Sequence, residues 1–214
     1  MSVAQNIAAI RTHIPAGVTL LCVSKFHPAE MIAEAYSAGE RDFGESHVQE
    51  LVRKHDLLPK DIRWHMIGHL QTNKVRAIVP FVYLIHSVDS QHLLAVIQRE
   101  AARINVVVNV LLEVHVAREE TKSGFTPDEL QALLDSGVLA QMPNIHVEGI
   151  MGMATNTDDT AEIQRCFGAL SAIYHAHPEW NTLSMGMSED YLQAIASGST
   201  MVRIGSAIFG ERQY

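Results

Sequence analysis

Short apolar or β-branched runs alternate with segments of helical periodicity along this 214-residue chain. The eight runs occupy 18–24, 41–44, 63–67, 81–87, 106–115, 147–153, 182–185 and 201–205. Strands that alternate with helices pair in parallel through right-handed crossovers, so the alternatives are an open doubly wound sheet and a closed barrel. Eight repeats spaced about 25 residues apart favour a barrel near the small end of its usual size range. We therefore predict an α/β fold, a single (β/α)8 TIM barrel that forms one domain over residues 1–214.

The segments between the runs carry helix start and stop signals. An extra helix is expected before the first strand, because apolar residues of 3–14 recur at helical spacing and Ser2 forms a capping box with Gln5. Another helix is expected to begin at Asp89, and Ser188 is the expected N-cap of the last long one. Three of the predicted helices end at glycines, which are Gly39, Gly137 and Gly198.

Charge and hydropathy exclude several classes of protein. Lys and Arg number 16 against 24 Asp and Glu, a net charge of −8 without a concentrated basic patch, which argues against binding nucleic acid or anionic lipid. The apolar stretches are too short or too interrupted to cross a membrane. The first ten residues hold no Lys or Arg and no signal-peptide core, so we expect a cytoplasmic protein. Cys22 and Cys166 are then expected to be buried, reduced thiols.

Lys25 is the first candidate for chemistry, because it directly follows the first predicted strand. In a barrel of this class the active face lies at the carboxyl ends of the strands. A lysine rooted beside the apolar wall there is partly desolvated, and its neutral amine becomes available as a nucleophile towards a carbonyl. The competing interpretation of a lone lysine at this place is a solvated side chain at a strand end.

Two later loops resemble the places where barrels commonly hold a phosphate. Ser184 and Ser188 follow the seventh predicted strand, and Gly205 with Ser206 follows the eighth. Backbone N–H groups and small residues in these loops allow an anion to approach closely. Each residue also has a purely structural interpretation, such as a helix cap or a strand-end turn. Together with Lys25, however, they make a pattern that packing alone does not require.

The histidines are not expected to hold a metal. His65 and His69 have the spacing of helical metal ligands, but the accompanying glutamate is missing, Gly68 lies between them and the segment starts as a strand. Most of the 12 histidines are expected at the surface of helices and loops. The sequence therefore predicts no metal site.

Six segments closely resemble the pyridoxal phosphate homeostasis protein family. They are CVSK at 22–25, DFGESHVQE at 42–50, WHMIGHLQTNK at 64–74, HSVDS at 86–90, VEGIMGM at 147–153 and the long final segment at 183–212. The resemblance covers essentially the whole chain in order. It implies a stand-alone barrel like the N-terminal domain of alanine racemase, of the kind called fold type III, with pyridoxal 5'-phosphate as its cofactor.

The resemblance also implies roles for individual residues. Lys25 matches the lysine that forms the aldimine, and Arg203 matches the arginine that faces the pyridine nitrogen. The remaining cofactor-binding positions are Ser184, Ser188, Gly205 and Ser206 around the phosphate, with Ser46 and Met151 nearer the ring. The family usually has an asparagine where this chain has Ser46, which changes one contact near the ring. An arginine stays charged and does not protonate the ring nitrogen, so the cofactor is a weaker electron sink than one paired with a carboxylate.

Three functions follow from these residues. The first, which the resemblance favours, is a protein of vitamin B6 homeostasis that holds the cofactor as a Schiff base on Lys25 and stores it or delivers it to apo-enzymes. The second is a racemase-like enzyme using the same site, and the third is a Schiff-base aldolase whose substrate phosphate occupies the rim. Sustained racemase turnover is not expected, since none of the five tyrosines has an evident path to the rim. The polar, acidic surface favours a monomer.

Overall fold

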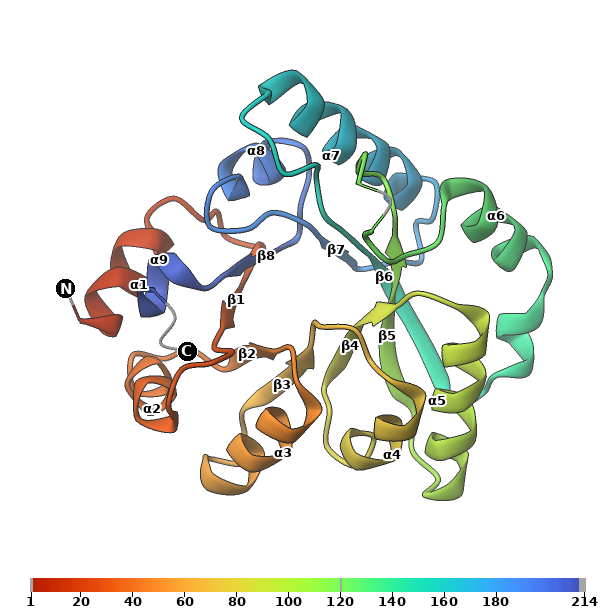
Figure 1. Cartoon of the computed structure of the whole chain (residues 1–214), viewed down its shortest axis with the longest axis horizontal. Helices are drawn as coiled ribbons and strands as arrows, with labels where there is room; N and C mark the ends of the chain where they lie inside the picture. The colour runs from red at the N-terminus through yellow and green to blue at the C-terminus, as the bar shows by residue number, and fades with distance from the viewer. Residues whose placement is uncertain (1, 120, 212–214) are drawn as a thin grey trace.

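The strands close into one parallel barrel in which each strand pairs with its neighbours in chain order (Figure 1). The computed structural model describes residues 2–119 and 121–211. The strands are β1 (Thr19–Val23), β2 (Asp42–Glu45), β3 (Arg63–Met66), β4 (Leu84–Val88), β5 (Val108–Val114), β6 (Ile145–Gly152), β7 (Thr182–Ser184) and β8 (Met201–Ile204). Parallel pairing of β1 with both β2 and β8 completes the ring. The predicted (β/α)8 barrel is therefore confirmed, and its strands lie within a few residues of the predicted runs.

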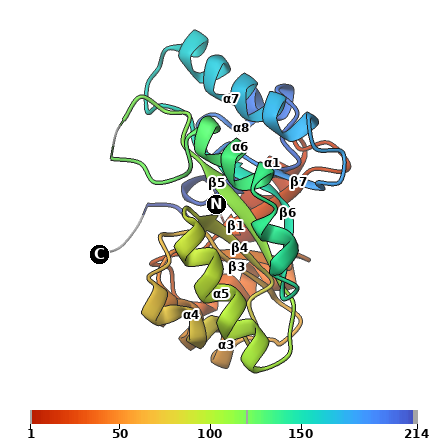
Figure 2. The ribbon, with the colours of Figure 1, turned by 90° about the vertical axis from the view of Figure 1, so that its right-hand side faces the viewer.

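Helices surround the barrel on its outer side (Figures 1 and 2). They are α1 (Val3–Arg11), α2 (Ala29–Ser37), α3 (Val48–Leu57), α4 (Val75–Ile78), α5 (Gln91–Arg103), α6 (Pro127–Asp135), α7 (Thr160–His175), α8 (Tyr191–Ala196) and α9 (Ser206–Phe209), with short 3₁₀ turns η1 (Thr72–Lys74) and η2 (Val138–Gln141). The extra helix α1 has the predicted capping box between Ser2 and Gln5, and it packs against α9 near the other end of the chain.

Two predicted helix starts are wrong. Helix α8 begins at Tyr191 with Asp190 at its N-cap, because the Asp190 carboxylate accepts a hydrogen bond from the Met187 N–H and closes a turn before the helix. Ser188 therefore lies in the loop and is not the cap. Helix α5 likewise begins at Gln91 rather than at the expected Asp89, since the hydroxyl of Ser90 caps it by accepting from the Leu93 N–H.

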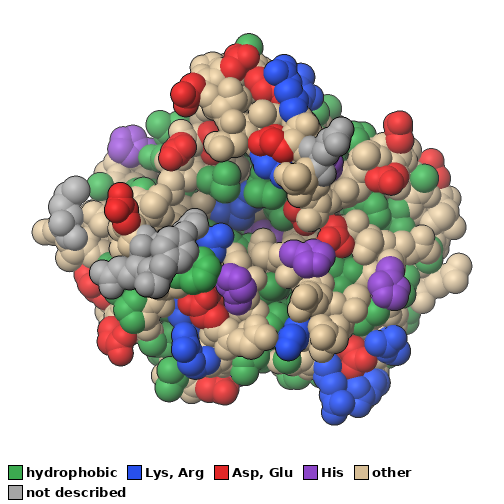
Figure 3. All heavy atoms as spheres, in the orientation of Figure 1, with side chains coloured by type: hydrophobic (Ala, Val, Ile, Leu, Met, Phe, Trp, Pro, Cys, Tyr) green, Lys and Arg blue, Asp and Glu red, His purple; other side chains and the backbone are tan. Residues whose placement is uncertain are grey.

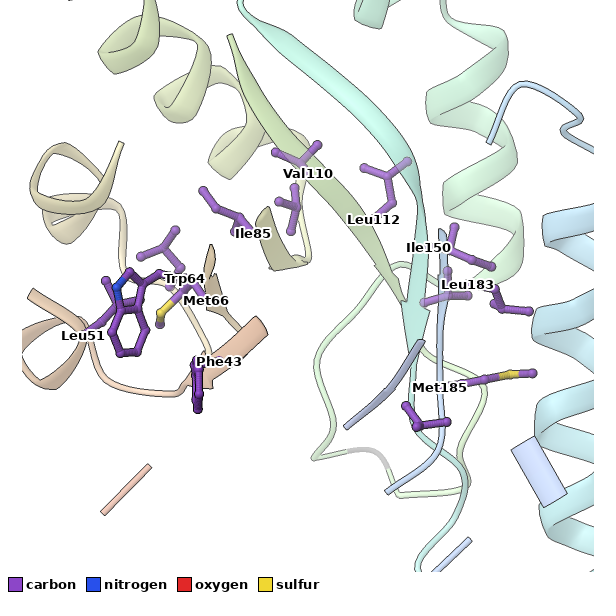
Figure 4. Packing of buried hydrophobic residues seen from close by; sticks show 14 of the residues in the cluster. Phe43, Leu51, Trp64, Met66, Ile85, Val110, Leu112, Ile150, Leu183 and Met185 are labelled. Carbon is purple, nitrogen blue, oxygen red and sulfur yellow. The ribbon is translucent and has the colours of Figure 1, made fainter. Parts of the chain in front are cut away.

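Alternation of side chains along each strand separates two apolar regions. The larger one fills the space between barrel and helices, where Phe43, Trp64, Ile85 and Leu112 point outward from their strands (Figure 4). A smaller cluster lies inside the barrel and consists of Leu21, Leu84, Leu111, Met151 and Met201. This inner cluster offers no hydrogen-bond partners. Polar side chains that point into the barrel elsewhere must therefore bond to one another, because burying an unpaired polar group costs free energy.

Two absences hold for the described residues only. Within 2–119 and 121–211, no helix combines the length and the apolar character that a bilayer crossing requires. Cys22 and Cys166 are both buried and both free, as the sequence predicts. His27 is buried, unlike most of the histidines in helices and loops, and His65 and His86 are buried on β3 and β4.

Candidate functional site

The loops at the carboxyl ends of the strands surround a hollow in the middle of one face, where basic and histidine side chains gather (Figure 3). One part of it is a cleft of about 660 Å³ whose lining includes Lys25, Ser46 and Glu113. A second cleft, of about 470 Å³, lies over the loops after β6 and β7 and includes Ser188 and Ser206. Lys122 lines both clefts. The structure thus places Lys25 and the two serines on the same rim.

Buried charges hold the chain on both sides of Lys25. The Ser24 hydroxyl donates to Glu45 Oε1 at 2.6 Å, and Lys54 Nζ donates to the Ser24 carbonyl at 2.8 Å. On the other side, Phe26 has a φ of +67° and its N–H donates to Glu50 at 2.8 Å. A left-handed backbone at a non-glycine residue persists only where its surroundings enforce it. The exit of β1 is therefore fixed just where the lysine leaves the strand.

Lys54 is the centre of this arrangement. Its Nζ lies 2.7 Å from both Glu45 Oε1 and Glu50 Oε1, and its side chain is 2% exposed. Burial raises the pKa of Glu45 to about 7 in spite of the opposing charge of Lys54. The second oxygen of Glu45 has no hydrogen-bond partner among the described residues. We name Ser24, Glu45, Glu50 and Lys54 the lysine clamp.

Arg203 points into the barrel from β8 and is 5% exposed. Its Nη1 donates to the carbonyl and to the hydroxyl of Ser184, both at 2.8 Å, and its Nη2 donates to the Gly152 carbonyl at 3.1 Å. Burial lowers its pKa to about 10. It stays a cation near neutral pH, and these contacts hold its guanidinium in one orientation.

Ser184 does not join the loops that the sequence analysis grouped around a phosphate. Its side chain is fully buried, its hydroxyl accepts from Arg203, and the same oxygen lies 3.1 Å from His86 Nδ1. The period of two along a strand turns this last residue of β7 into the barrel rather than onto the rim. The structure therefore makes Ser184 a partner of Arg203.

Ser188, Gly205 and Ser206 do come together, and we name them the serine cradle. The Ser188 hydroxyl lies 3.4 Å from the Gly205 nitrogen, which donates to it, and 3.1 Å from the Ser206 hydroxyl. A Cβ on Gly205 would meet the carbonyl oxygen of Val23 at 3.2 Å, so glycine lets the two strand ends approach. Two hydroxyls and a backbone N–H, none of them charged, form a donor set that suits a phosphate group.

Ser46 and Met151 occupy different depths of the site. Ser46 is half-buried in the cleft beside Lys25, and its backbone packs against Gly68, where a Cβ would come within 2.4 Å of the Ser46 carbonyl oxygen. Met151 is 2% exposed and belongs to the apolar cluster inside the barrel. Ser46 can thus offer a polar contact at the rim, whereas Met151 contributes to the floor.

Glu113 and His86 are two residues of this region for which the sequence predicted no role. Glu113 is the inward-facing residue near the end of β5; it lines the cleft with Lys25, and burial together with the nearby charge of Asp89 raises its pKa to about 7. Its position at the end of a predicted strand was the available signal. His86 lies inside β4, where nothing in the local pattern distinguishes it from a core residue.

His65 and His69, the two histidines with the spacing of metal ligands, have different surroundings. His65 is buried and contacts Asp42 and His86, whereas His69 is exposed and contacts Asp89. Among residues 2–119 and 121–211, no group of three or more His, Cys, Asp or Glu side chains is arranged to hold a metal ion.

Comparison with known proteins places this arrangement in context. Residues 1–213 match the family described as alanine racemase, N-terminal domain. A protein of Aquifex aeolicus named pyridoxal phosphate homeostasis protein is 41% identical over 201 residues, covering 91% of this chain and 87% of its own. The protein of the same name from Pseudomonas aeruginosa is 37% identical and covers 100% of this chain and 97% of its own.

Solved structures agree with the sequence comparison. PipY of Synechococcus elongatus, solved with pyridoxal phosphate bound, has a TM-score of 0.89 and 36% identity, covering 98% of this chain and 100% of its own. Alanine racemase from E. faecalis has a TM-score of 0.79 at 18% identity. It shares the fold alone, and this chain corresponds to 57% of its length.

Proposed function

This chain belongs to the family of the pyridoxal phosphate homeostasis proteins, and from that premise we propose that it binds pyridoxal 5'-phosphate at the rim of its barrel as part of vitamin B6 homeostasis. The observation that carries the proposal is that Lys25 and the serine cradle lie on one rim, while Arg203 is held at the carboxyl ends of β6 and β7 by Gly152 and Ser184. Each of these matches a different part of the cofactor.

The donor set fits that molecule group by group. The cradle supplies uncharged donors for the phosphate, and the buried cation Arg203 supplies a donor for the pyridine nitrogen. When bound, the cofactor offers an aldehyde that condenses with a primary amine, and Lys25 is the amine that we assign to it. The lysine clamp fixes the backbone on both sides of Lys25. The backbone that carries this amine therefore does not need to reorganise when the cofactor binds.

The surroundings favour binding over racemisation. Racemisation needs an acid-base group on each face of the substrate carbon. Among the described tyrosines, Tyr36 bonds to Asp61 and Tyr174 to the Trp180 carbonyl. Tyr83 precedes β4 at the opposite end of the barrel, and Tyr191, at the start of α8, packs against the apolar core between barrel and helices. Arg203 also leaves the ring nitrogen unprotonated, which limits stabilisation of a carbanion. We propose storage or delivery of the cofactor to apo-enzymes by a cytoplasmic monomer.

Trapping the bound cofactor tests the assignment of Lys25. Purified protein is incubated with pyridoxal phosphate, reduced with borohydride and digested, and mass spectrometry locates the added pyridoxyl group. We expect the group on Lys25, and we expect Lys25→Ala to keep its fold but lose the absorbing, borohydride-sensitive species. Lys74 and Lys122 line the same cleft and serve as internal controls. Labelling of either one in place of Lys25 would refute the assignment.

A further inference from the structure

Polar side chains cross the inside of the barrel in a continuous line that the proposed cofactor contacts do not explain. The line begins at Asp42, the first residue of β2, and passes through His65 on β3 and His86 on β4. It continues through Ser184 on β7 to Arg203 on β8. All five residues are buried, and we name them the inner line.

The distances allow one hydrogen bond at every step. Asp42 Oδ1 lies 3.1 Å from His65 Nε2, and His65 Nδ1 lies 2.9 Å from His86 Nε2. His86 Nδ1 lies 3.1 Å from the Ser184 hydroxyl, which receives Arg203 Nη1 at 2.8 Å. Each imidazole thus uses both ring nitrogens, and each bond needs one donor and one acceptor.

The two ends of the line decide where the protons are. Arg203 can only donate, so Ser184 Oγ accepts from it. At the other end, burial alone would raise the pKa of Asp42, but hydrogen bonds from Arg63 and His65 bring it down to about 2. Asp42 is therefore a carboxylate that only accepts, and the proton between it and His65 lies on Nε2 of the histidine.

The remaining protons follow. The Ser184 hydroxyl needs an acceptor for its own hydrogen, and its partners among the described residues are Arg203 and His86. Since Arg203 cannot accept, the hydroxyl donates to His86 Nδ1. Burial, with a further contribution from the nearby cation Arg203, lowers the pKa of His86 well below its usual value, so its ring is neutral and its single proton lies on Nε2. That nitrogen donates to His65 Nδ1.

We propose that Asp42, His65, His86 and Ser184 act as positioning residues that hold Arg203 as the donor to the pyridine nitrogen, through hydrogen bonds that all point from Arg203 towards Asp42. A one-way line between a cation and a carboxylate polarises each member in the same sense and strengthens every bond. Asp42 also pairs with Arg63, whose side chain is 45% exposed, so the line reaches solvent at the end of the barrel away from Lys25. The role of Arg203 here rests on the proposed function, but the proton positions do not.

Nuclear magnetic resonance of the ligand-free protein tests the proton positions. Long-range ¹H–¹⁵N correlations of labelled histidine distinguish the Nδ1–H tautomer, the Nε2–H tautomer and the imidazolium, and His65→Asn and His86→Asn assign the signals. We expect both rings as neutral Nε2–H tautomers at pH 7. An imidazolium or an Nδ1–H tautomer at either residue would overturn the one-way line.

Binding of a ring analogue tests the role of Arg203. The affinity for pyridoxal phosphate is compared with that for its 1-deaza analogue, which lacks the pyridine nitrogen. We expect Ser184→Ala to lower the preference for the natural cofactor by about two- to tenfold, the range of one hydrogen bond. Ser184→Thr keeps the hydroxyl and should restore the preference.

Ser199→Ala is the matched control, because Ser199 is also a buried serine beside β7 but bonds to backbone carbonyls outside the line. It should lower stability without changing the preference. An unchanged preference in Ser184→Ala, with the cofactor still bound, would overturn the role of the line. Failure of the wild-type protein to bind pyridoxal phosphate at all would instead overturn the proposed function, while the tautomers would still report on the line.

Discussion

The lysine clamp and the serine cradle lie on the same rim but are built in opposite ways. The clamp consists of buried charges around Lys54, with hydrogen bonds of 2.6 to 2.8 Å to the backbone and side chains beside Lys25. The cradle consists of two small hydroxyls and a glycine N–H, with contacts of 3.1 and 3.4 Å at or near the exposed edge of the barrel. The side chains of the clamp are therefore held in place by strong internal bonds, whereas those of the cradle can adjust to a ligand.

The difference reflects what each region has to bind. A covalent attachment requires one amine at one place, so the backbone that carries it must be fixed before the ligand arrives. An anion requires several donors that are not already committed to strong partners. Strong internal bonds therefore suit the clamp and would weaken the cradle. The comparison predicts that damage to the clamp lowers folding stability, whereas damage to the cradle lowers affinity.

The largest expected effect is that of Lys54→Met. Removing the ammonium leaves Glu45 and Glu50 without their cation, and loss of one partner from a buried ion pair typically costs about 3–5 kcal/mol of unfolding free energy. Denaturant unfolding measures the loss. Arg53→Met is the control, because Arg53 is an exposed residue on the same helix and should change stability by less than about 0.5 kcal/mol. Equal losses of unfolding free energy in the two variants would show that the clamp does not stabilise the fold more than an exposed residue does.

Glu113 is a buried carboxyl of the rim that belongs to neither the lysine clamp nor the serine cradle, so its effect on stability can be compared with theirs. Its pKa is raised to about 7 in the folded protein, so the stability it contributes is present below the unfolded value of 4.5 and is lost as pH rises through about 7. Glu113→Gln should therefore gain stability relative to the wild type by about 2–3 kcal/mol between pH 5 and pH 8. Unfolding measured at both pH values checks this, with the exposed Glu30→Gln as the control.

Phosphate discrimination tests the cradle itself. Charge-assisted hydrogen bonds are worth roughly 1.5–3 kcal/mol each, so pyridoxal should bind at least about tenfold more weakly than pyridoxal phosphate. Gly205→Ala adds a methyl group that must displace the Val23 carbonyl at 3.2 Å, and it should reduce this discrimination. Titration with both aldehydes measures the ratio. Equal affinities in the wild-type protein would refute the cradle.

Ser206→Ala should have the smallest effect. It removes one hydroxyl at an exposed position, while the Ser188 hydroxyl and the Gly205 N–H remain. We expect the affinity for pyridoxal phosphate to fall by less than about tenfold and the unfolding free energy to change by less than about 0.5 kcal/mol. A loss of stability comparable to that of Lys54→Met would remove the distinction between the two regions.

Local pattern was sufficient for the elements and for much of the rim. Strand periodicity, glycine stops and the capping box at Ser2 are properties of neighbouring residues, and they predicted the order of the strands and the places of Lys25, Ser188, Gly205 and Ser206 at the strand ends. Because barrel strands end on one face, position along the chain alone predicted that these residues share a rim. The hydrogen-bond partners of these residues could not be predicted from position along the chain.

The local order of residues was enough to predict which segments become strands and helices, because those preferences depend on residues two to four positions apart. Three arrangements follow only from the three-dimensional structure: Ser184 faces Arg203 rather than the cradle, Lys54 bonds to the Ser24 carbonyl beside Lys25, and Asp42, His65 and His86 form a line. These contacts join residues of different strands and helices, from 19 positions apart for Ser184 and Arg203 to 98 for His86 and Ser184, and the register of the strands is set by closure of the barrel. Contacts between residues so far apart in the sequence leave no periodic pattern in either segment. They can therefore be identified only once every strand of the barrel is in place.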